Sequence, residues 1–210
     1  MIKIENVVVE GWAAAIRGMR NPMNSWDKSD TKFEGAYGVI HTVNLGENDR
    51  ALAMKLVKAG PVHAKFRRMI NVTFDITAPL YWWKEFDTYK VGTVRNSCST
   101  MHKIQAKRFE LDDFSEEHLN ENSIDVLFRI IRILNEYRTE YLRNSDKTAW
   151  WQMIQLLPSS YNQRSTIQLN YEVLAHMYHD RRAHKLDEWR AFCDWIKTLP
   201  YSELITGEEK

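Results

Sequence analysis

The order in which strand-like and helix-like segments follow one another is the feature that most constrains this fold. β-Branched residues and alternating apolar positions predict strands over residues 2–9 and 69–77. Apolar residues at helical spacing predict helices over residues 12–19, 48–59, 80–89, 113–143, 150–157, 166–178 and 187–198. Because this order lacks regular βαβ alternation, it predicts an α+β fold in which a small antiparallel or mixed sheet is packed with several helices.

The segment from residue 113 to residue 143 has the strongest helical pattern. Asp113 and Glu116 have the spacing of a capping box at its start. Its apolar residues are Leu119, Ile124, Val126, Leu127, Ile130, Ile131, Ile133 and Leu134. Turn-forming residues predict loops over 20–35, 91–100 and 159–165. The sequence contains no repeat, low-complexity tract or linker, so residues 1–210 are expected to form a single domain.

Charge and cysteine content exclude several classes of protein. Lysine and arginine minus aspartate and glutamate give 29 − 28 = +1, which argues against a protein that binds long nucleic acid by charge alone. Cys98 and Cys193 are too few for a disulfide scaffold and favour a reducing compartment. We find no signal peptide and no apolar run near the ~20 residues that span a bilayer, so a cytoplasmic location without membrane contact is expected.

Short catalytic motifs do not identify a function. The sequence has no phosphate-binding GxxxxGK[ST] or GxGxxG and no HExxH zinc motif. His176 and His179 share a helical spacing, but a polar helix face explains them better than a metal site, so no metal is expected. Cys98 and His102 allow a nucleophile pair, although a small buried residue in a tight turn is the simpler interpretation.

Two separated segments carry a more specific pattern. The first contains TFDITAP at residues 73–79 and YKVGTVRNSCSTM at residues 89–101. The second contains LLP at residues 156–158, then Asn170, Arg181 and a last helix with Glu188-Trp189-Arg190. In order and spacing they resemble the flavin-dependent thymidylate synthases, whose signature is RHRxxSxNExSxR. Asn96 and Ser99 match the Asn and the second Ser of that signature.

The departures from this family pattern concern charged residues. Tyr89-Lys90-Val91 stands where the family has RHR, and Met101 stands at the final arginine. Ser97 replaces the signature glutamate, and Glu85 aligns with a glutamine upstream of RHR. Two further arginines of the family correspond to Ile154 and Glu172. Because a nucleotide monophosphate is usually held by arginine forks, a changed pyrimidine nucleotide is one expectation, with Lys90, Arg95, His102 and Lys103 as compensating cations.

The resemblance implies a complete reaction. Such an enzyme methylates dUMP at C5 to give dTMP, with methylenetetrahydrofolate as carbon donor, FAD as hydride carrier and NADPH as reductant. The protein then stacks flat molecules and fixes their charges, while the cofactors supply the chemistry. The resemblance also implies a homotetramer with sites between subunits. The pairs Trp82-Trp83 and Trp150-Trp151 suit such an interface or, equally, the core.

The resemblance assigns roles to eight residues. The nucleotide-binding residues are Ser99, Ser97, Arg181 and Glu85, and the cofactor-binding residues are His63, Lys90, Asn96 and Asn170. Arg181 is also the catalytic candidate, because a guanidinium stabilises negative charge that develops on the uracil ring. Plainer interpretations exist: a solvated helix end for Arg181, a turn for Ser99 and a loop for His63. Asn170 is expected within a helix, where asparagine is disfavoured, and this favours a functional role.

The sequence leaves three hypotheses for the function of this protein. The first is a flavin-dependent thymidylate synthase-like enzyme. The second is a non-catalytic nucleotide-binding or interaction protein that keeps the same fold, because the flavin-holding triplet is lost. The third, a single-strand binder that uses tryptophan and lysine, is disfavoured by the net charge of +1.

Overall fold

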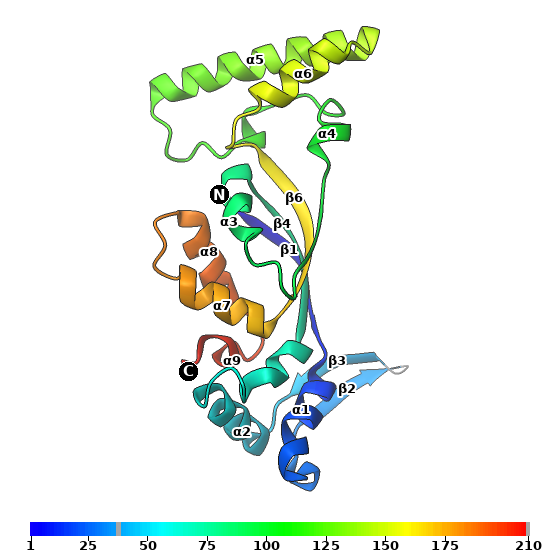
Figure 1. Ribbon diagram of the computed structural model, residues 1–210, viewed down its shortest axis with the longest axis vertical. Coiled ribbons are helices and arrows are strands. Elements are labelled where there is room, and N and C mark those ends of the chain that lie inside the picture. Colours follow the sequence, from blue (N-terminus) through cyan, green and yellow to red (C-terminus); the bar gives the residue numbers. More distant parts are fainter. Residues whose placement is uncertain (37–38, 209–210) are drawn as a thin grey trace. The chain divides into compact units, whose positions relative to one another are not determined.

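The computed structural model describes residues 1–36 and 39–208 (Figure 1). Its chain divides into two compact units that alternate along the sequence. The first unit comprises Met1–Ile4, Asp75–Thr88 and Arg95–Thr166, and the second comprises Glu5–Phe74, Tyr89–Val94 and Ile167–Lys210. The single domain expected over residues 1–210 stays a prediction.

Two sheets and many helices confirm the α+β class. The larger sheet has the strand order β1-β4-β6-β5, with β1 at Lys3–Glu10, β4 at Asn71–Pro79, β6 at Asn162–Asn170 and β5 at Val94–Ser97. The smaller sheet is an antiparallel pair of β2 (Lys32–Ala36) and β3 (Val39–Asn44). The loops expected at residues 20–35, 91–100 and 159–165 are therefore wrong where β2, β5 and β6 form.

Strand β6 also corrects the helix expected from residue 166. Its side chains alternate between buried and exposed, with Gln163, Ser165, Ile167 and Leu169 on the buried face. This period of two belongs to a strand. The helix that follows, α7 (Tyr171–Arg181), begins only after Asn170.

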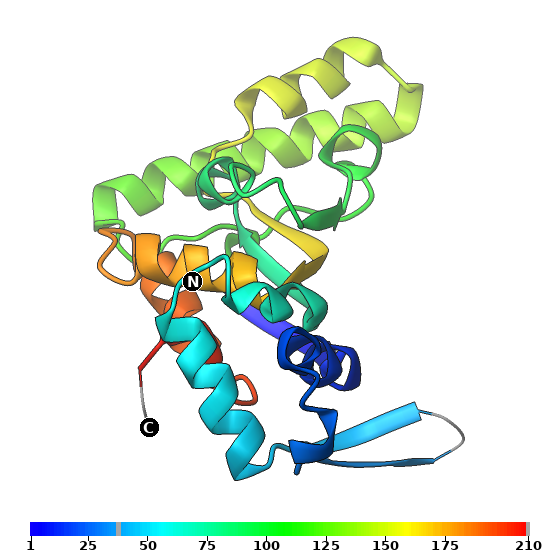
Figure 2. The same ribbon diagram turned by 60° about the horizontal axis from the view of Figure 1, so that its bottom comes forward.

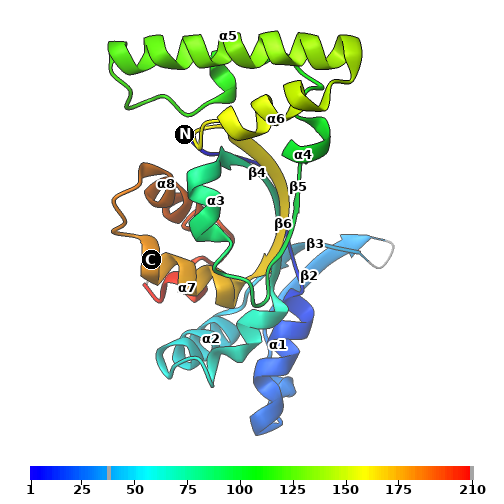
Figure 3. The same cartoon turned by 45° about the horizontal axis from the view of Figure 1, so that its top comes forward.

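The first unit is dominated by two helices, α5 (Glu121–Asn144) and α6 (Lys147–Leu156), which lie side by side (Figures 1 and 3). The prediction that this helix begins at residue 113 was wrong, because α5 begins at Glu121. Asn120 caps α5 by accepting a hydrogen bond from the Ser123 amide at 3.0 Å, whereas the capping box forms between Glu110 and Asp113 on a separate 3-10 turn. The buried core around α5 contains Phe109, Phe114, Leu127, Leu134 and Met153.

The remaining helices of the first unit are short. They are α3 (Leu80–Phe86), α4 (Thr100–Lys103) and the 3-10 turn η4 (Leu111–Asp113). Trp82 and Trp83 of α3 are buried, with ring centroids 5.0 Å apart, so they belong to the core. Trp150 is only half-buried and Trp151 is exposed.

Within its described residues, the second unit contains four further α-helices besides α7, together with three 3-10 helices (α1 dark blue and α2 cyan in Figure 2). They are α1 (Trp12–Arg20), η1 (Asn21–Met23), η2 (Trp26–Lys28), α2 (Glu47–Lys58), η3 (Ala64–Met69), α8 (Asp187–Ile196) and α9 (Glu203–Thr206). Trp12 packs edge-on against Tyr171 and Tyr201 in its core. No helix in residues 1–36 and 39–208 is both long and apolar enough to cross a membrane.

A buried ion pair joins α1 to α2 in this unit. Nε of Arg20 lies 2.5 Å from Oδ1 of Asp49, and the second Asp49 oxygen accepts hydrogen bonds from Ser29 and Thr31. Burial raises the pKa of Asp49, but the hydrogen bonds from Thr31, Ser29 and Arg20 together outweigh it and lower the pKa overall. Asp49 is therefore a buried carboxylate held in its charged form.

Candidate functional site

Within the second unit, Tyr89 of the signature-like segment lies against the end of α7. Its hydroxyl accepts a hydrogen bond from Nε of Arg181 at 3.0 Å and donates one to Oδ2 of Asp180 at 3.1 Å. Burial raises the pKa of Tyr89, Arg181 lowers it and Asp180 raises it, and the net effect is a raised pKa. The phenol is thus neutral at physiological pH and bridges the two charged groups.

The guanidinium of Arg181 also lies over two aromatic rings. Its central carbon is 5.0 Å from the ring centroid of Trp189 on α8 and 5.7 Å from that of Tyr89. Cation–π contacts at this range favour a fixed guanidinium. The interpretation of Arg181 as a solvated helix end therefore does not account for the contacts that hold its guanidinium.

Gly92 brings the same segment against the start of α7. Its φ of 78° suits glycine, and a Cβ there would lie 3.2 Å from Nδ2 of Asn170 and 3.2 Å from Cγ2 of Val173. Asn170 was expected inside a helix, but it is the N-cap of α7. Its Oδ1 accepts hydrogen bonds from the Glu172 and Val173 amides, each at 3.1 Å. Asparagine is favoured at an N-cap, so the argument from helix propensity does not apply.

In the first unit, Arg95 on β5 is fully engaged by protein groups. Its guanidinium carbon lies 3.7 Å from the ring centroid of Trp83, and Nη1 contacts both carboxylate oxygens of Asp87 at 2.8 and 2.7 Å. Nη2 donates to Gln163 at 2.6 Å and Nε donates to Ser165 at 3.1 Å. Each of the three nitrogens has a protein partner, which supports a structural role for Arg95 over the expected role of a compensating cation.

The nucleotide-binding candidates of the first unit lie on β5, α3 and the start of α4. Ser97 and its neighbour Asn96, a cofactor candidate, are exposed, whereas Glu85 on α3 is half-buried. Oγ of Ser99 caps α4 by accepting a hydrogen bond from the His102 amide at 3.0 Å. That bond explains Ser99 as a helix cap and leaves its hydroxyl hydrogen available to donate.

The other candidates, His63, Lys90, Asn170 and Arg181, belong to the second unit. His63 is the exposed residue before η3, and Lys90 is exposed next to Tyr89. The segment 89–94 runs along α7, with Tyr89 at Arg181 and Gly92 at Asn170, so the candidates Arg181 and Asn170 lie at opposite ends of the helix. The contact of Tyr89 with Arg181 was not predicted from the sequence. The only signal for it was an aromatic residue at a position where the resembling family has arginine.

The paired histidines and the two cysteines were the candidates for metal and thiol chemistry. No group of three or more His, Cys, Asp or Glu side chains in residues 1–36 and 39–208 is placed to hold a metal ion. His176 is exposed and lies 3.8 Å from Glu172, as suits a polar helix face. Cys98 is an exposed free thiol, so its interpretation as a small buried residue is wrong, and Cys193 is a buried free thiol.

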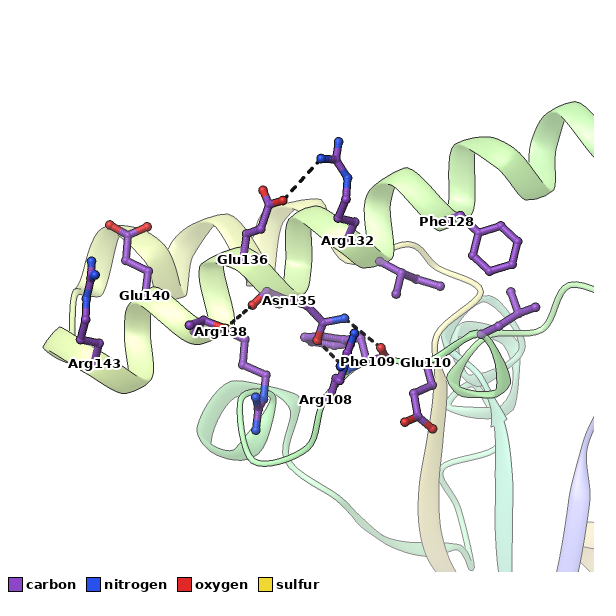
Figure 4. Close-up of a pocket in the computed structure, with 13 residues that line it drawn as sticks. Arg108, Phe109, Glu110, Phe128, Arg132, Asn135, Glu136, Arg138, Glu140 and Arg143 are labelled. Atoms are coloured by element: carbon purple, nitrogen blue, oxygen red, sulfur yellow. Dashed lines mark hydrogen bonds and ion pairs between the residues drawn. The ribbon is translucent and has the colours of Figure 1, made fainter.

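Two of the hollows that open on the first unit are lined by charged side chains. The larger, which we call the α5 hollow, has a volume of about 1040 Å³ and lies between residues 108–111 and one face of α5 (Figure 4). Its charged side chains have both signs: Arg108, Glu110, Arg132, Glu136, Arg138, Glu140 and Arg143. The smaller, which we call the Met101 hollow, has a volume of about 310 Å³ and is bounded by α4, the end of α5 and the start of α6.

Comparisons with known proteins show the fold. The sequence matches no protein-family model and no curated protein. Among solved structures, it is similar to the flavin-dependent thymidylate synthase ThyX from Helicobacter pylori, complexed with FAD and dUMP. That match has a TM-score of 0.71 and 16% identity, and it covers 99% of this chain and 100% of the other.

A second similar structure is the UMP/dUMP methylase PolB from Streptomyces cacaoi, bound with 5-Br dUMP. Its TM-score is 0.63 at 14% identity, over 98% of this chain and 94% of the other. Both matches extend over nearly the whole chain, while the sequences have diverged widely. The chain has the fold of the flavin-dependent thymidylate synthases.

Proposed function

We propose that this protein binds a uracil nucleotide and methylates it at C5, as a divergent enzyme of the flavin-dependent thymidylate synthase type. The observation that supports this most is the contact between the signature-like segment 89–94 and helix α7, because it surrounds Arg181 with Tyr89 and Trp189. The family resemblance implies that this arginine binds the nucleotide. The likeness of the whole chain to two nucleotide-bound structures supports the same class of ligand.

The residues of the chain have separate roles in this proposal. Arg181 stabilises negative charge that develops on the uracil ring, since a preorganised guanidinium needs no rearrangement during the reaction. Tyr89 holds Nε of Arg181 and so fixes the direction of its remaining donors. Ser99 donates its hydroxyl hydrogen to the nucleotide phosphate, and Ser97 and Glu85 contact the nucleotide.

The residues of the family triplet do not fit FAD as the resemblance implies. Tyr89 is engaged with Arg181 and Asp180, and Val91 is an apolar side chain with 91% exposure. Only Lys90 offers a cation where the family has two arginines and a histidine. In this proposal His63, Lys90, Asn96 and Asn170 are the residues that remain to hold FAD, and NADPH and methylenetetrahydrofolate are the further reactants.

This misfit favours a second function, which is nucleotide binding without turnover. A protein that keeps the fold and Arg181 but lacks the flavin triplet retains a means of recognising a pyrimidine without a hydride carrier. The two functions differ in one outcome: only the enzyme releases tritium from C5-labelled dUMP or UMP when FAD, NADPH and methylenetetrahydrofolate are supplied.

Calorimetry with dUMP and UMP tests the binding that both functions share. We expect Arg181→Gln to weaken binding about tenfold or more, because a charge-assisted hydrogen bond is lost. Arg182→Gln is the matched control, since Arg182 is exposed and contacts Glu208. Equal affinity for the wild type and R181Q contradicts the role of Arg181, and absence of binding by the wild type contradicts both functions.

The homotetramer is part of the same proposal. Light scattering coupled to size exclusion measures the mass of the assembly directly. A monomeric mass of 24.9 kDa at micromolar concentration contradicts it.

A further inference from the structure

Hydrogen bonds fix the two walls of the α5 hollow (Figure 4). The side chain of Asn135 on α5 pairs with the backbone of Phe109, because its Nδ2 donates to the Phe109 carbonyl at 2.9 Å and its Oδ1 accepts from the Phe109 amide at 3.0 Å. Nε of Arg138, further along α5, donates to the carbonyl of Gln105 at 2.8 Å. These three bonds hold the segment 105–109 at a set position beside the helix.

Part of the hollow is apolar. Phe109 and Ile131 line it and are buried, and Leu111 is half-buried beside the same core. Phe128 lies near one end of the hollow, far from Arg143, and half of its side chain is exposed (Figure 4). An exposed aromatic side chain next to a fixed apolar surface is typical of a position that another apolar group covers.

Four of the charged side chains have partners inside the protein. Arg132 pairs with Glu136 at 3.5 Å. The carboxylate of Glu110 accepts a hydrogen bond from the Asp113 amide in the capping box of η4. Nε of Arg138 is held by the Gln105 carbonyl, which leaves the two Nη nitrogens of its half-buried guanidinium without a partner among the described residues.

The remaining charges of the hollow are mostly positive. Arg108 and Arg143 are exposed, and neither has an ion pair or a side-chain hydrogen bond within residues 1–36 and 39–208. Glu140 is the one carboxylate of the lining without a partner in that part of the chain. Two free arginines and the Nη nitrogens of Arg138 thus stand against a single free acid, so charge complementarity favours an acidic ligand over a basic one.

The size of the hollow favours a chain over a compact molecule. Its volume of about 1040 Å³ lies at the top of the ~300–1,000 Å³ typical of small-molecule sites. Along α5 it extends from Phe128 to Arg143, which is ~22 Å at 1.5 Å per residue. Three glutamates in the lining disfavour a polyanion such as RNA, whose binding depends on neutralised phosphates.

We propose that the α5 hollow binds an extended acidic segment of a partner protein. An apolar side chain of that segment lies against Phe128 and Ile131, and a carboxylate binds the Nη nitrogens of Arg138. Because Nε of Arg138 is already held in place, its guanidinium loses little freedom when it binds. The hollow contains none of the residues assigned to the nucleotide or the cofactor, so this inference does not depend on the proposed function.

The geometry of α5 also sets the spacing within the bound segment. Along the helix, Arg138 lies ~10 Å from Ile131 and ~15 Å from Phe128. An extended chain advances ~3.3 Å per residue, and its alternate side chains point the same way. Four residues, or ~13 Å, therefore match both the distance and the face. We expect an apolar residue followed by Asp or Glu four positions later.

Methyl NMR of the whole protein tests the site with defined peptides. The probe is a nine-residue peptide, acetylated and amidated, with Leu third and Glu seventh in a Gly/Ser background. We expect the methyl signals of Leu111 and Ile131 to shift with saturation, at a dissociation constant of about 1 mM or lower. Ile131→Val identifies the δ1 methyl signal of Ile131. Gln in place of the probe's Glu should weaken binding about tenfold, and Glu moved to the sixth position several-fold.

Variants separate the charge of the hollow from its fold. Arg138→Gln is expected to weaken binding about tenfold, with a melting-temperature measurement to detect any effect of the lost Gln105 bond. Arg108→Gln removes a charge that has no bond to lose within the described residues, and should weaken binding about threefold at an unchanged melting temperature. Arg129→Gln is the matched control, since Arg129 is exposed on α5 but does not line the hollow.

The outcomes that overturn the inference are specific. No saturable shift at Leu111 or Ile131 with millimolar peptide overturns it, as do equal effects of R108Q and R129Q. Equal affinity for peptides with Glu at every position from the fourth to the eighth removes the extended geometry. Sodium decanoate that binds as tightly as the peptide assigns the hollow to a small apolar acid instead. A smaller assembly mass for R108Q than for the wild type, measured by light scattering, assigns it to contact between copies of this chain.

Discussion

The hydroxyl of Tyr89 accepts a hydrogen bond from Nε of Arg181 at 3.0 Å, across 92 positions of sequence. The same hydroxyl donates to Asp180, so one neutral phenol orders a cation and an anion at the end of α7. A side chain that stands where the resembling family has arginine thus positions the arginine that this chain retains.

Tyr89→Phe tests that relationship. The ring stays near Trp189, but Arg181 loses the acceptor at Nε, so we expect uracil-nucleotide affinity to fall several-fold while stability falls by about 1 kcal/mol. Calorimetry and urea denaturation measure the two effects. Asp180→Asn is the matched variant, because it leaves the Tyr89–Arg181 bond in place; a larger loss of affinity in D180N than in Y89F contradicts the positioning role.

Arg95→Lys tests the conclusion that Arg95 is structural. Lysine keeps the charge but loses the stack on Trp83 and the paired contacts with Asp87, so we expect a loss of about 1–3 kcal/mol in the free energy of unfolding. Urea denaturation measures it, with Lys84→Gln on exposed α3 surface as control. Stability equal to that of the wild type, together with weaker nucleotide binding, is the result that rejects a structural role.

Asp49 predicts how stability depends on pH. Because hydrogen bonds lower its pKa in the folded state below the usual 3.8, its contribution is present above pH 3.8 and is lost as pH falls through the lower folded value. Asp49→Asn leaves Arg20 buried without its counter-ion and is expected to cost about 3–5 kcal/mol at pH 7.

The pH profile of D49N then separates this group from the others. As pH falls below 3.8, wild-type stability should fall more steeply than that of D49N, as measured by urea denaturation at each pH. Asp27→Asn, at an exposed acid, should keep the wild-type profile. Parallel profiles for wild type and D49N are incompatible with the lowered pKa.

Gly92→Ala tests the close approach of the signature-like segment to α7. The substitution combines a positive φ with contacts of 3.2 Å to Asn170 and Val173, so we expect a cost of about 1–3 kcal/mol. Gly60 also has a positive φ, but a Cβ there meets nothing within 4 Å. Thermal unfolding of G92A should therefore show a larger loss than that of G60A, and equal losses would remove the crowding argument.

Local pattern was sufficient for much of the architecture. The apolar spacing around Leu127 and Leu134 predicted α5, and Asn144-Ser145-Asp146 correctly marked its end. The spacing from LLP through Asn170 to Arg181 identified a fold that comparison of structures then confirmed. These features succeed because helix periodicity, turns and motif spacing are recorded in neighbouring residues.

Strand β6 and the surroundings of Arg181 depended on the tertiary structure. Gln163 and Ser165 look like loop residues in sequence, yet they are buried on strand β6, where Arg95, 68 and 70 positions away, hydrogen-bonds to both. Tyr89 likewise acquires its role only when the chain returns with Arg181. Sequence by itself determined the centres of the long helices and which residue carries the positive charge. The partners that neutralise, orient or bury those groups were decided by contacts between distant segments, which no local pattern encodes.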